Sequence, residues 1–184
     1  APAARLPGRR VVTAAAPRVA EAWRVLRQVP DPEVPALSVC DLGIVREVSE
    51  AGDGALDVVL TPTYSGCPAT EVIERSVLDA IDAAGLGPAR ATLRRAPAWT
   101  TDWISDDGRR KLRDYGIAPP GPVDAAATGA PLRLVRGAAH PAPIACPRCG
   151  SADTERLSAF GSTACKSLYR CRACREPFEH FKPI

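Results

Sequence analysis

The sequence has 184 residues, of which 46% are hydrophobic and 24% charged, a composition typical of a globular protein. Its longest apolar runs extend over only a few residues. A membrane-spanning helix needs roughly 18 or more, so we exclude a transmembrane protein and expect no membrane partner. The N-terminal segment lacks the continuous apolar centre of a secretory signal, so we expect a cytoplasmic protein. The seven cysteines should then be reduced and available for metal or thiol chemistry.

The net charge of +3 is unevenly distributed. Residues 1–18 contain four arginines and no acidic residue, residues 19–132 contain 11 basic and 17 acidic residues, and residues 133–184 contain nine basic and four acidic residues. Binding of one Zn²⁺ by four cysteine thiolates would lower the net positive charge of residues 133–184. We therefore expect no nucleic-acid partner, because such a partner usually requires a strongly basic surface.

The first predicted helix begins at Pro17. Before it, residues 1–16 are rich in Ala, Pro and Arg without hydrophobic periodicity, which predicts a flexible arm. Proline is favourable in the first turn of a helix, whereas Pro30 prevents this helix from continuing. Apolar residues recur between the two prolines at helical spacing: Val19, Ala22, Trp23, Leu26 and Val29. The further prolines at positions 32 and 35 predict a stiff, extended loop.

A β-hairpin is predicted next, because two β-rich segments flank the turn sequence Gly-Asp-Gly at 52–54. The hairpin strands are predicted at 44–49 and 56–61, and a further strand near 91–95. Between them, an amphipathic helix ends at Gly85 and Gly87 and has its apolar positions at Val72, Ile73, Val77, Leu78 and Ile81. A short helix that Ser105 caps and Gly116 stops follows the last strand. The order α-β-β-α-β-α predicts an α+β fold in which residues 17–116 form a small two-layer α/β domain with a mixed sheet.

The rest of the chain divides into a linker and a second module. Residues 117–131 are mostly Pro, Ala and Gly, which predicts a linker. Residues 132–184 contain few large apolar side chains but four regularly spaced cysteines, which predicts a small β-ribbon, with strands near 167–170 and 178–182, folded around a metal ion.

The four cysteines of this module form two C-x₂-C pairs, and their spacing is the most specific signal in the sequence. Cys146 and Cys149 precede Cys171 and Cys174 by 21 intervening residues, as in zinc ribbons. We expect structural Zn²⁺, which would supply about 10 kcal/mol or more of stability. Iron would also suit four thiolates and would indicate rubredoxin-like electron transfer, and two disulfides are the remaining alternative.

Three further residues of this module are possible auxiliary ligands. Cys165 could replace a ribbon cysteine or lie beside the metal site, although an unpaired buried cysteine is the simpler interpretation. His140 and His180 could also bind metal. We interpret both histidines as surface residues.

Cys67 is predicted to be a reactive thiol. It directly precedes Pro68, a favourable first residue of a helix, so its sulfur would lie at the helix N-cap among Ser65, Gly66 and Thr70. Free backbone N–H groups and the positive end of the helix dipole stabilise a thiolate there, which predicts a lowered pKa. The alternative is that Cys67 only fills space.

The partners available to Cys67 favour metal or thiol chemistry over hydrolysis. No histidine occurs before residue 140, so a Cys–His hydrolase lacks its base in this domain. Carboxylates on the proline-rich loop are candidate hard ligands or hydrogen-bond partners: Asp31, Glu33 and Asp41. Cys40, which follows alternating apolar residues, is expected in the core.

The segments DPEVP, CDLGIV and TPTYSGCPA together resemble SufT-like iron–sulfur assembly proteins over about residues 19–95. The resemblance implies an α/β fold, a role in the maturation of iron–sulfur proteins, a reactive cysteine at Cys67 and an acidic pair at Asp31 and Glu33. With the ribbon sequences FGSTACKSLYRC and EPFEHFK, the whole chain resembles the PaaD family of the phenylacetyl-CoA epoxidase system.

This second resemblance implies an accessory protein that matures or supplies metal to the di-iron oxygenase or the iron–sulfur reductase of that system. Its cofactors would be structural Zn²⁺ and a transient Fe ion or Fe–S cluster, and its partners those subunits, with a homodimer also possible. We expect no catalytic centre, because the Glu-x-x-His motifs of di-iron bundles and the glycine-rich loop of nucleotide-dependent reductases are absent from the sequence. The alternatives are a zinc-stabilised scaffold and, less favoured, a nucleic-acid-binding ribbon.

Overall fold

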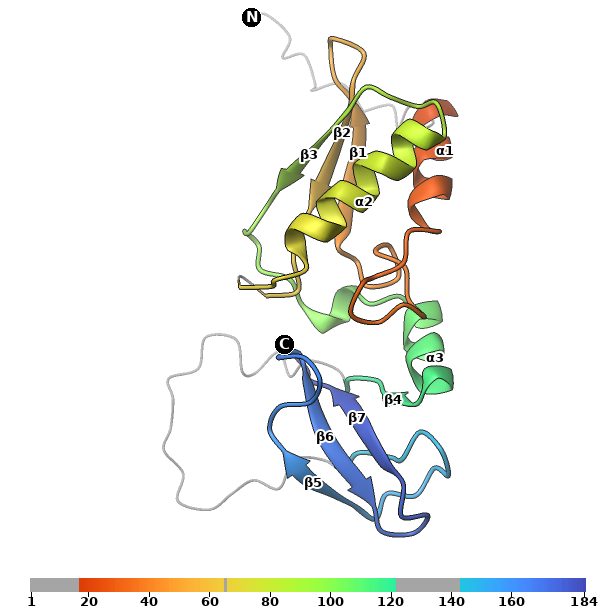
Figure 1. The fold of residues 1–184 in the computed structure, drawn as a ribbon, viewed down its shortest axis with the longest axis vertical. Coiled ribbons are helices and arrows are strands. Elements are labelled where there is room, and N and C mark those ends of the chain that lie inside the picture. Colours follow the sequence, from red (N-terminus) through yellow and green to blue (C-terminus); the bar gives the residue numbers. More distant parts are fainter. Residues whose placement is uncertain (1–16, 65, 122–142) are drawn as a thin grey trace, which may run out of the picture.

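A computed structural model describes residues 17–64, 66–121 and 143–184 (Figure 1). The predicted arm at 1–16, most of the predicted linker, Ser65 and His140 lie outside these residues. Two sheets form the centres of two parts of the molecule, one of three strands and one of four.

The elements of the first part follow the predicted order α-β-β-α-β-α. They are α1 (Pro17–Leu26), β1 (Val45–Glu50), β2 (Leu56–Leu60), α2 (Thr70–Ala83), β3 (Ala89–Leu93), the 3₁₀ helix η1 (Thr101–Trp103) and α3 (Asp106–Tyr115). Strand β2 is central, antiparallel to β1 and parallel to β3, so the sheet is mixed as predicted. The parallel pair requires a crossover connection, which α2 provides.

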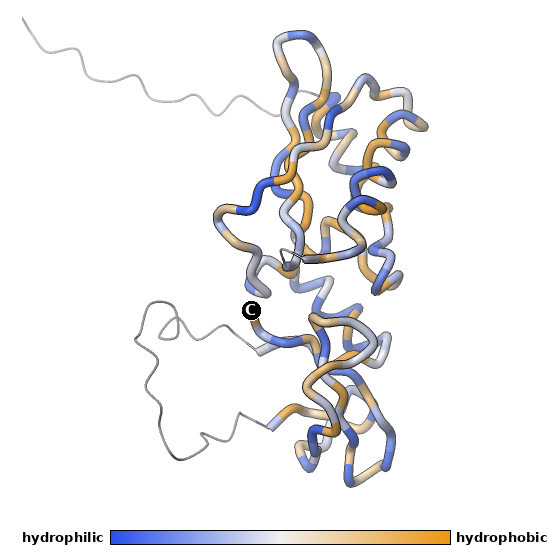
Figure 2. Tube along the Cα trace, turned by 60° about the vertical axis from the view of Figure 1, so that its left-hand side comes forward, coloured by the Kyte–Doolittle hydropathy of each residue, from blue (hydrophilic) through white to orange (hydrophobic). Residues whose placement is uncertain are grey.

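Helices α1 and α2 cover one face of this sheet (Figure 1). Their apolar stripes meet it through buried residues such as Leu26 on α1 and Val77 on α2. Hydrophobic and hydrophilic segments therefore alternate along both helices (Figure 2). Among the described residues, no helix has the length and apolar character needed to cross a bilayer.

The end of the first part is fixed by two caps that the sequence predicts. The Ser105 hydroxyl accepts a hydrogen bond from the Gly108 N–H at 2.9 Å, which starts α3. Gly116 ends α3 with a φ of 94°, a left-handed conformation that favours glycine.

The second part is a four-stranded sheet formed by β4 (Ile117–Ala118), β5 (Thr154–Ser158), β6 (Lys166–Cys171) and β7 (Pro177–Phe181), in the order β4-β7-β6-β5. Strand β4 runs parallel to β7, and the other neighbours are antiparallel. The first two residues of the predicted linker are therefore part of the ribbon sheet, because Ile117 is apolar enough to be buried there. Prolines 119 and 120 follow directly.

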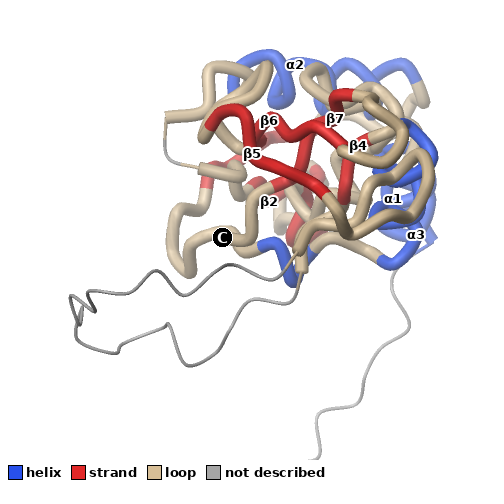
Figure 3. The backbone as a smooth tube through the Cα atoms, turned by 90° about the horizontal axis from the view of Figure 1, so that it is seen from below, coloured by secondary structure: helices blue, strands red, loops and turns tan. Residues whose placement is uncertain are grey.

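The larger hydrophobic core extends across both parts. Cys165 and Phe181, from the ribbon end of the chain, belong to the same buried cluster as the residues of the first part. The rings of Trp99 and Phe181 lie 6.0 Å apart across the junction, and the N–H of Thr101 donates to the carbonyl of Ile184 at 3.1 Å. In the view from below, the ribbon strands lie in front of the first part (Figure 3). The junction is a packed interface.

Candidate metal and thiol sites

Two short loops of the ribbon bring its four paired cysteines together. The sulfurs of Cys146, Cys149, Cys171 and Cys174 all lie within 4.8 Å of one another. The Sγ–Sγ distances are 3.8 Å for Cys146 and Cys174, and 3.6 Å for Cys149 and Cys171. A tetrahedral site with Zn–S bonds of about 2.3 Å has sulfurs about 3.8 Å apart. The cluster therefore fits Zn²⁺, and the separations are far too long for disulfide bonds.

The two loops have the same backbone shape. Gly150 follows the first pair with a φ of 75°, and Arg175 follows the second pair with a φ of 69°. The N–H of Gly150 donates to the carbonyl of Cys146 at 2.8 Å and closes the first turn. The N–H of Cys174 points at the sulfur of Cys171, and this hydrogen bond is the main reason that the pKa of Cys171 falls to about 7. A thiol of lowered pKa is readily converted to the thiolate that binds metal.

A small cavity lies at the junction of the two parts. Its volume of about 10 Å³ is close to the minimum that holds one water molecule or a single ion. The polar residues that line it come from three segments far apart in the sequence: Asp31, Glu33, Thr63, Cys67 and Cys165. Apolar side chains, including Ile73 and Phe181, complete the wall. Most of the predicted thiol site is therefore assembled at the domain junction.

Cys67 is half-buried at this cavity, and its environment differs from the prediction. Helix α2 begins at Thr70 with Ala69 as its N-cap, so Cys67 precedes the helix by a turn in which the Thr70 N–H and hydroxyl both donate to the Cys67 carbonyl. Burial raises the pKa of the Cys67 thiol, and the nearby Glu33 carboxylate adds to the rise. The predicted lowering of this pKa is wrong, because desolvation outweighs the hydrogen bond from the Ala69 N–H.

Asp31 is buried at the start of the proline-rich loop. One of its carboxylate oxygens, Oδ1, accepts hydrogen bonds from the N–H groups of Glu33 at 2.9 Å and Val34 at 2.8 Å. Burial nevertheless raises the pKa of Asp31. The two N–H donors fix the carboxylate at the cavity wall.

Glu33 lies beside both Asp31 and the ribbon. Burial raises the pKa of the Glu33 carboxyl, and the charge of Asp31 raises it further. The sulfur of Cys165 lies 3.9 Å from Glu33 Oε2. Cys165 thus contacts the first domain, and it is not a member of the four-cysteine cluster. Burial also raises the pKa of the Cys165 thiol.

Asp41, the remaining candidate ligand, and Cys40, which is expected in the core, do not line the cavity. The Asp41 carboxylate accepts hydrogen bonds from the Ser38 N–H and hydroxyl and pairs with Lys111 at 2.8 Å, so it ties the loop to α3. These partners lower the pKa of Asp41 in spite of its partial burial. Cys40 packs against the core as predicted, and burial raises the pKa of its thiol to about 12.

Sequence reasoning also missed Lys166 and Tyr64, two polar residues near the cavity. Lys166 has only 3% of its side chain exposed, and its ammonium group lies 3.0 Å from Glu179 Oε2. It also influences the pKa values of Asp31 and Glu33 through its charge. Burial raises the pKa of Tyr64, as do the charges of Cys67 and Glu33. The position of Lys166 directly after Cys165, and that of Tyr64 in the loop before Cys67, were the available signals.

The prediction that His180 is a surface residue is wrong. His180 is buried on β7, where its ring contacts Tyr169 edge-on and its Nδ1 lies 3.5 Å from the Ser167 hydroxyl. Its Nε2 is buried without a hydrogen-bond partner in the described part of the chain. Burial lowers the pKa of His180 to about 4, so the ring is neutral near pH 7.

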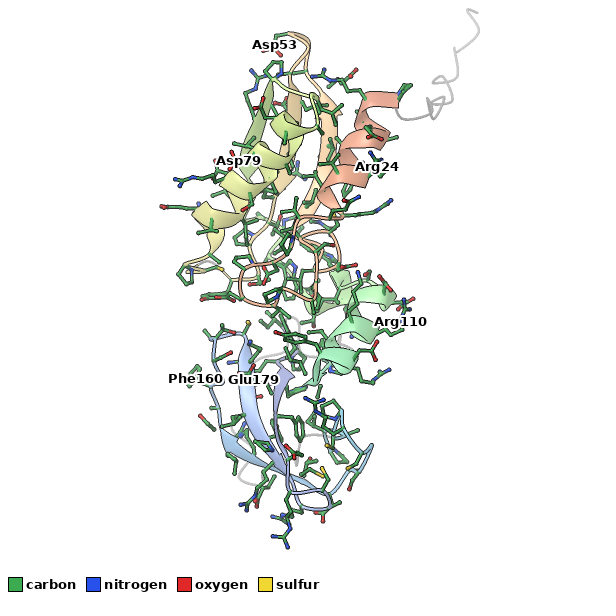
Figure 4. The ribbon with its side chains drawn as sticks, turned by 45° about the vertical axis from the view of Figure 1, so that its right-hand side comes forward. Arg24, Asp53, Asp79, Arg110, Phe160 and Glu179 are labelled. Atoms are coloured by element: carbon green, nitrogen blue, oxygen red, sulfur yellow. The ribbon has the colours of Figure 1, made fainter. Side chains whose placement is uncertain are left out.

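Three ribbon aromatics differ in their exposure to solvent. Phe178 is buried in the small ribbon core, and Tyr169 stacks on it at 5.8 Å. Phe160 is 65% exposed and points away from the ribbon body (Figure 4), with the Lys182 ammonium 4.6 Å from its ring centre. Of these three, Phe160 is the one available for contact with another molecule.

Comparison with known proteins gives matches for both parts. Residues 20–92 match the family described as iron-sulfur cluster assembly protein, and residues 133–182 match the PaaD zinc beta ribbon domain. The chain is 47% identical over 175 residues to the putative D subunit of 1,2-phenylacetyl-CoA epoxidase from Escherichia coli K12, covering 95% of this chain and 99% of that protein. It is 33% identical over 90 residues to the "Fe-S protein maturation auxiliary factor" of Porphyromonas gingivalis, covering 48% of this chain and 85% of that protein.

Among solved structures, the DUF59 domain of unknown function from Bacillus anthracis aligns with a TM-score of 0.48 and 21% identity over 52% of this chain and 91% of that chain. The fold, the four-cysteine cluster and the two family matches define an assembly-type α/β domain joined to a zinc ribbon. The chain belongs to the PaaD family, which includes the D subunit from Escherichia coli. The resemblance predicted from the sequence is confirmed.

Proposed function

We propose that this protein is a non-catalytic accessory subunit of a phenylacetyl-CoA epoxidase system, and that it delivers iron or an iron–sulfur fragment through Cys67. The observation that carries the proposal is the junction cavity, where Cys67 lies with Asp31 and Glu33. Thiol and carboxylate ligands together suit ferrous iron. The names of its relatives, an epoxidase subunit and an Fe-S maturation factor, support the same role.

The protonation of the cavity thiol favours temporary binding. Burial raises the pKa of Cys67 above its ordinary value, so an arriving cation must displace the thiol proton to bind the sulfur. Metal affinity is lowered by that competition. A site with moderate affinity can release its metal to an acceptor, whereas a closed four-thiolate site retains it.

The ribbon metal has a different role in this proposal. We assign Zn²⁺ to the four-cysteine cluster, where it stabilises the ribbon and does not take part in delivery. The ribbon also offers an exposed contact surface around Phe160 and Leu157, which are 65% and 50% exposed. We assign this surface to docking of the oxygenase or the iron–sulfur reductase.

The test is maturation of these subunits in cells that produce a Cys67→Ser variant. We expect less iron in the purified oxygenase or reductase, and lower epoxidase activity, than with the wild-type protein. Cys40→Ser is the matched control, because Cys40 is also half-buried but lies outside the cavity. Unchanged iron content and activity with Cys67→Ser would disprove delivery through this thiol.

A zinc-stabilised scaffold is the second candidate, and the raised pKa of Cys67 favours it, because a neutral thiol is a weak nucleophile and ligand. Deletion of the whole protein would separate the two functions. A scaffold predicts that deletion impairs the epoxidase complex while Cys67→Ser does not. Delivery predicts that both impair it.

A further inference from the structure

We propose that Cys165 of the ribbon supplies the second sulfur ligand of the junction cavity, so that both domains together bind one thiophilic divalent cation. The inference rests on the proposed function, for which the cation is ferrous iron. It assigns to the ribbon a direct part in the cargo site, separate from its own four-cysteine cluster.

The position of Cys165 carries this inference. Its sulfur lies 3.9 Å from Glu33 Oε2, across the junction between the domains. A tetrahedral ion with bonds of about 2.3 Å to sulfur and about 2.1 Å to oxygen would hold the two ligand atoms about 3.6 Å apart. The observed separation is therefore within a few tenths of an ångström of the distance that one shared ion imposes.

The segment that carries Cys165 is fixed on several sides. The Thr163 hydroxyl lies 3.0 Å from the sulfur, and the Cys165 carbonyl accepts a hydrogen bond from the Lys182 N–H at 2.9 Å. Cys165 itself is 4% exposed. A thiol held in this way keeps its place at the cavity wall while a cation enters beside it.

The charges around the cavity are suited to exchange of protons for a dication. Lys166 carries one positive charge, and three carboxylates lie near it: Glu179, Asp31 and Glu33. The two thiols are neutral, because burial raises the pKa of both Cys67 and Cys165. Binding of a dication with loss of one proton from each of the two thiols leaves the net charge of the group unchanged. The buried site therefore gains no net charge when it is loaded.

The cavity donors are more widely spaced than those of the ribbon cluster. Within the described residues, only the four ribbon cysteines bring three or more donor atoms within 4.8 Å of one another. Cys67 is half-buried and lies in a turn before α2, so its side chain is the one that must move to complete the site. Cys165 and Glu33 form the fixed side, and Cys67 forms the side that closes.

The experiment uses the zinc-loaded, full-length protein under anaerobic conditions with Fe²⁺ as the probe. X-ray absorption at the iron edge should detect two sulfur ligands on bound iron in the wild-type protein and one in Cys67→Ser or Cys165→Ser. Mutation of a residue that only hydrogen-bonds to a metal ligand lowers metal affinity about 10–100-fold. Loss of a ligand itself should cost at least as much, so each variant should bind Fe²⁺ at least about tenfold more weakly than the wild type. Cys40→Ser is the control and should bind iron as the wild type does.

The outcomes distinguish this inference from the proposed function. A single sulfur ligand in the wild type, or wild-type affinity in Cys165→Ser with a loss in Cys67→Ser, overturns the role of Cys165 and leaves delivery through Cys67 in place. Unchanged affinity in both variants overturns both. Zinc content of one ion per chain must be confirmed in each sample, so that iron in the ribbon is not counted. If Cys165→Ser does not fold, the wild-type absorption spectrum decides.

Discussion

The ribbon cluster and the junction cavity both contain cysteines, but they differ in the spacing and the chemical type of their ligands. The ribbon cluster has four sulfurs at mutual distances that match a zinc tetrahedron, and a backbone N–H lowers the pKa of Cys171 to about 7. The cavity combines thiols with carboxylates, and burial raises the pKa values of Cys67 and Cys165. Protonated, widely spaced ligands disfavour permanent metal binding, whereas four sulfurs already held at tetrahedral spacing favour it. The comparison separates a structural site from a candidate exchange site.

Removal of the ribbon metal should have the largest effect. The small ribbon core holds few buried residues, so the metal should contribute about 10 kcal/mol or more to its folding. Chelation, or Cys171→Ser, should abolish ordered amide signals from β5 to β7 while the α1–β3 region keeps its own. Nuclear magnetic resonance with zinc analysis measures this effect. A ribbon that stays ordered without metal would contradict the structural role of the cluster.

Truncation of the aromatic residue at the junction should have the next largest effect. Phe181 is buried at the cavity and packs against Trp99, so Phe181→Ala should cost about 3–5 kcal/mol and weaken the docking of the two parts. Phe160→Ala in the same ribbon is the matched control, and its exposed ring predicts a change within about 0.5 kcal/mol. Chemical denaturation followed by tryptophan fluorescence measures both. Equal effects of the two variants would show that the junction is not a packed interface.

Acid should destabilise the ribbon through His180. Its folded pKa of about 4 lies below the usual value of 6.5, so the neutral ring is favoured by folding and stability is lost as pH falls from about 6.5 towards 4. The loss from this group should reach about 2 kcal/mol at pH 5. The free energy of unfolding of the wild type and of His180→Phe should be measured at pH 7 and pH 5, at a fixed concentration of free zinc. Protonation of the zinc ligands destabilises both proteins equally, so the difference between their losses is the contribution of His180. Identical losses in the two proteins would exclude the histidine as the cause.

The smallest expected effect concerns the two similar metal-binding turns. Arg175 has a φ of 69°, a conformation that costs a residue other than glycine about 1 kcal/mol, so Arg175→Gly should stabilise the zinc-bound ribbon by up to that amount. Gly150→Ala should destabilise it similarly, since a Cβ there meets no atom within 4 Å and only the backbone conformation matters. Thermal unfolding of the zinc-bound forms measures both changes. Neither variant should alter iron binding in the cavity.

Sequence reasoning succeeded where the signal is local. The C-x₂-C spacing predicted the ribbon cluster because each turn positions two sulfurs by itself, and hydrophobic periodicity predicted the element order of the first domain. His180 was misassigned although it lies two residues after Phe178 and therefore on the same side of β7. That alternation was the signal for its burial.

The cavity could be predicted only in part, because its members are distant in the sequence. Glu33 and Cys165 are separated by 132 positions, and no local pattern shows that they meet. The predicted direction of the Cys67 pKa shift was wrong for the same reason. The burial of Cys67 and its carboxylate neighbours result from tertiary packing, which the adjacent helix does not reveal. Asp41 was predicted as a candidate ligand because it lies near Asp31 and Glu33 in the sequence. Its actual partner is Lys111 on α3, 70 residues away.

Strand β4 has a practical consequence for dissecting this protein. Family comparison starts the ribbon at residue 133, whereas residues 117 and 118 form its edge strand beside β7. A fragment that begins at the family limit exposes the unpaired edge of β7 and lacks the strand that covers it. If the chain is instead cut between residues 121 and 143, the N-terminal fragment keeps β4 and the C-terminal fragment keeps β7. The two fragments should bind each other when mixed, because β4 can pair with β7 again.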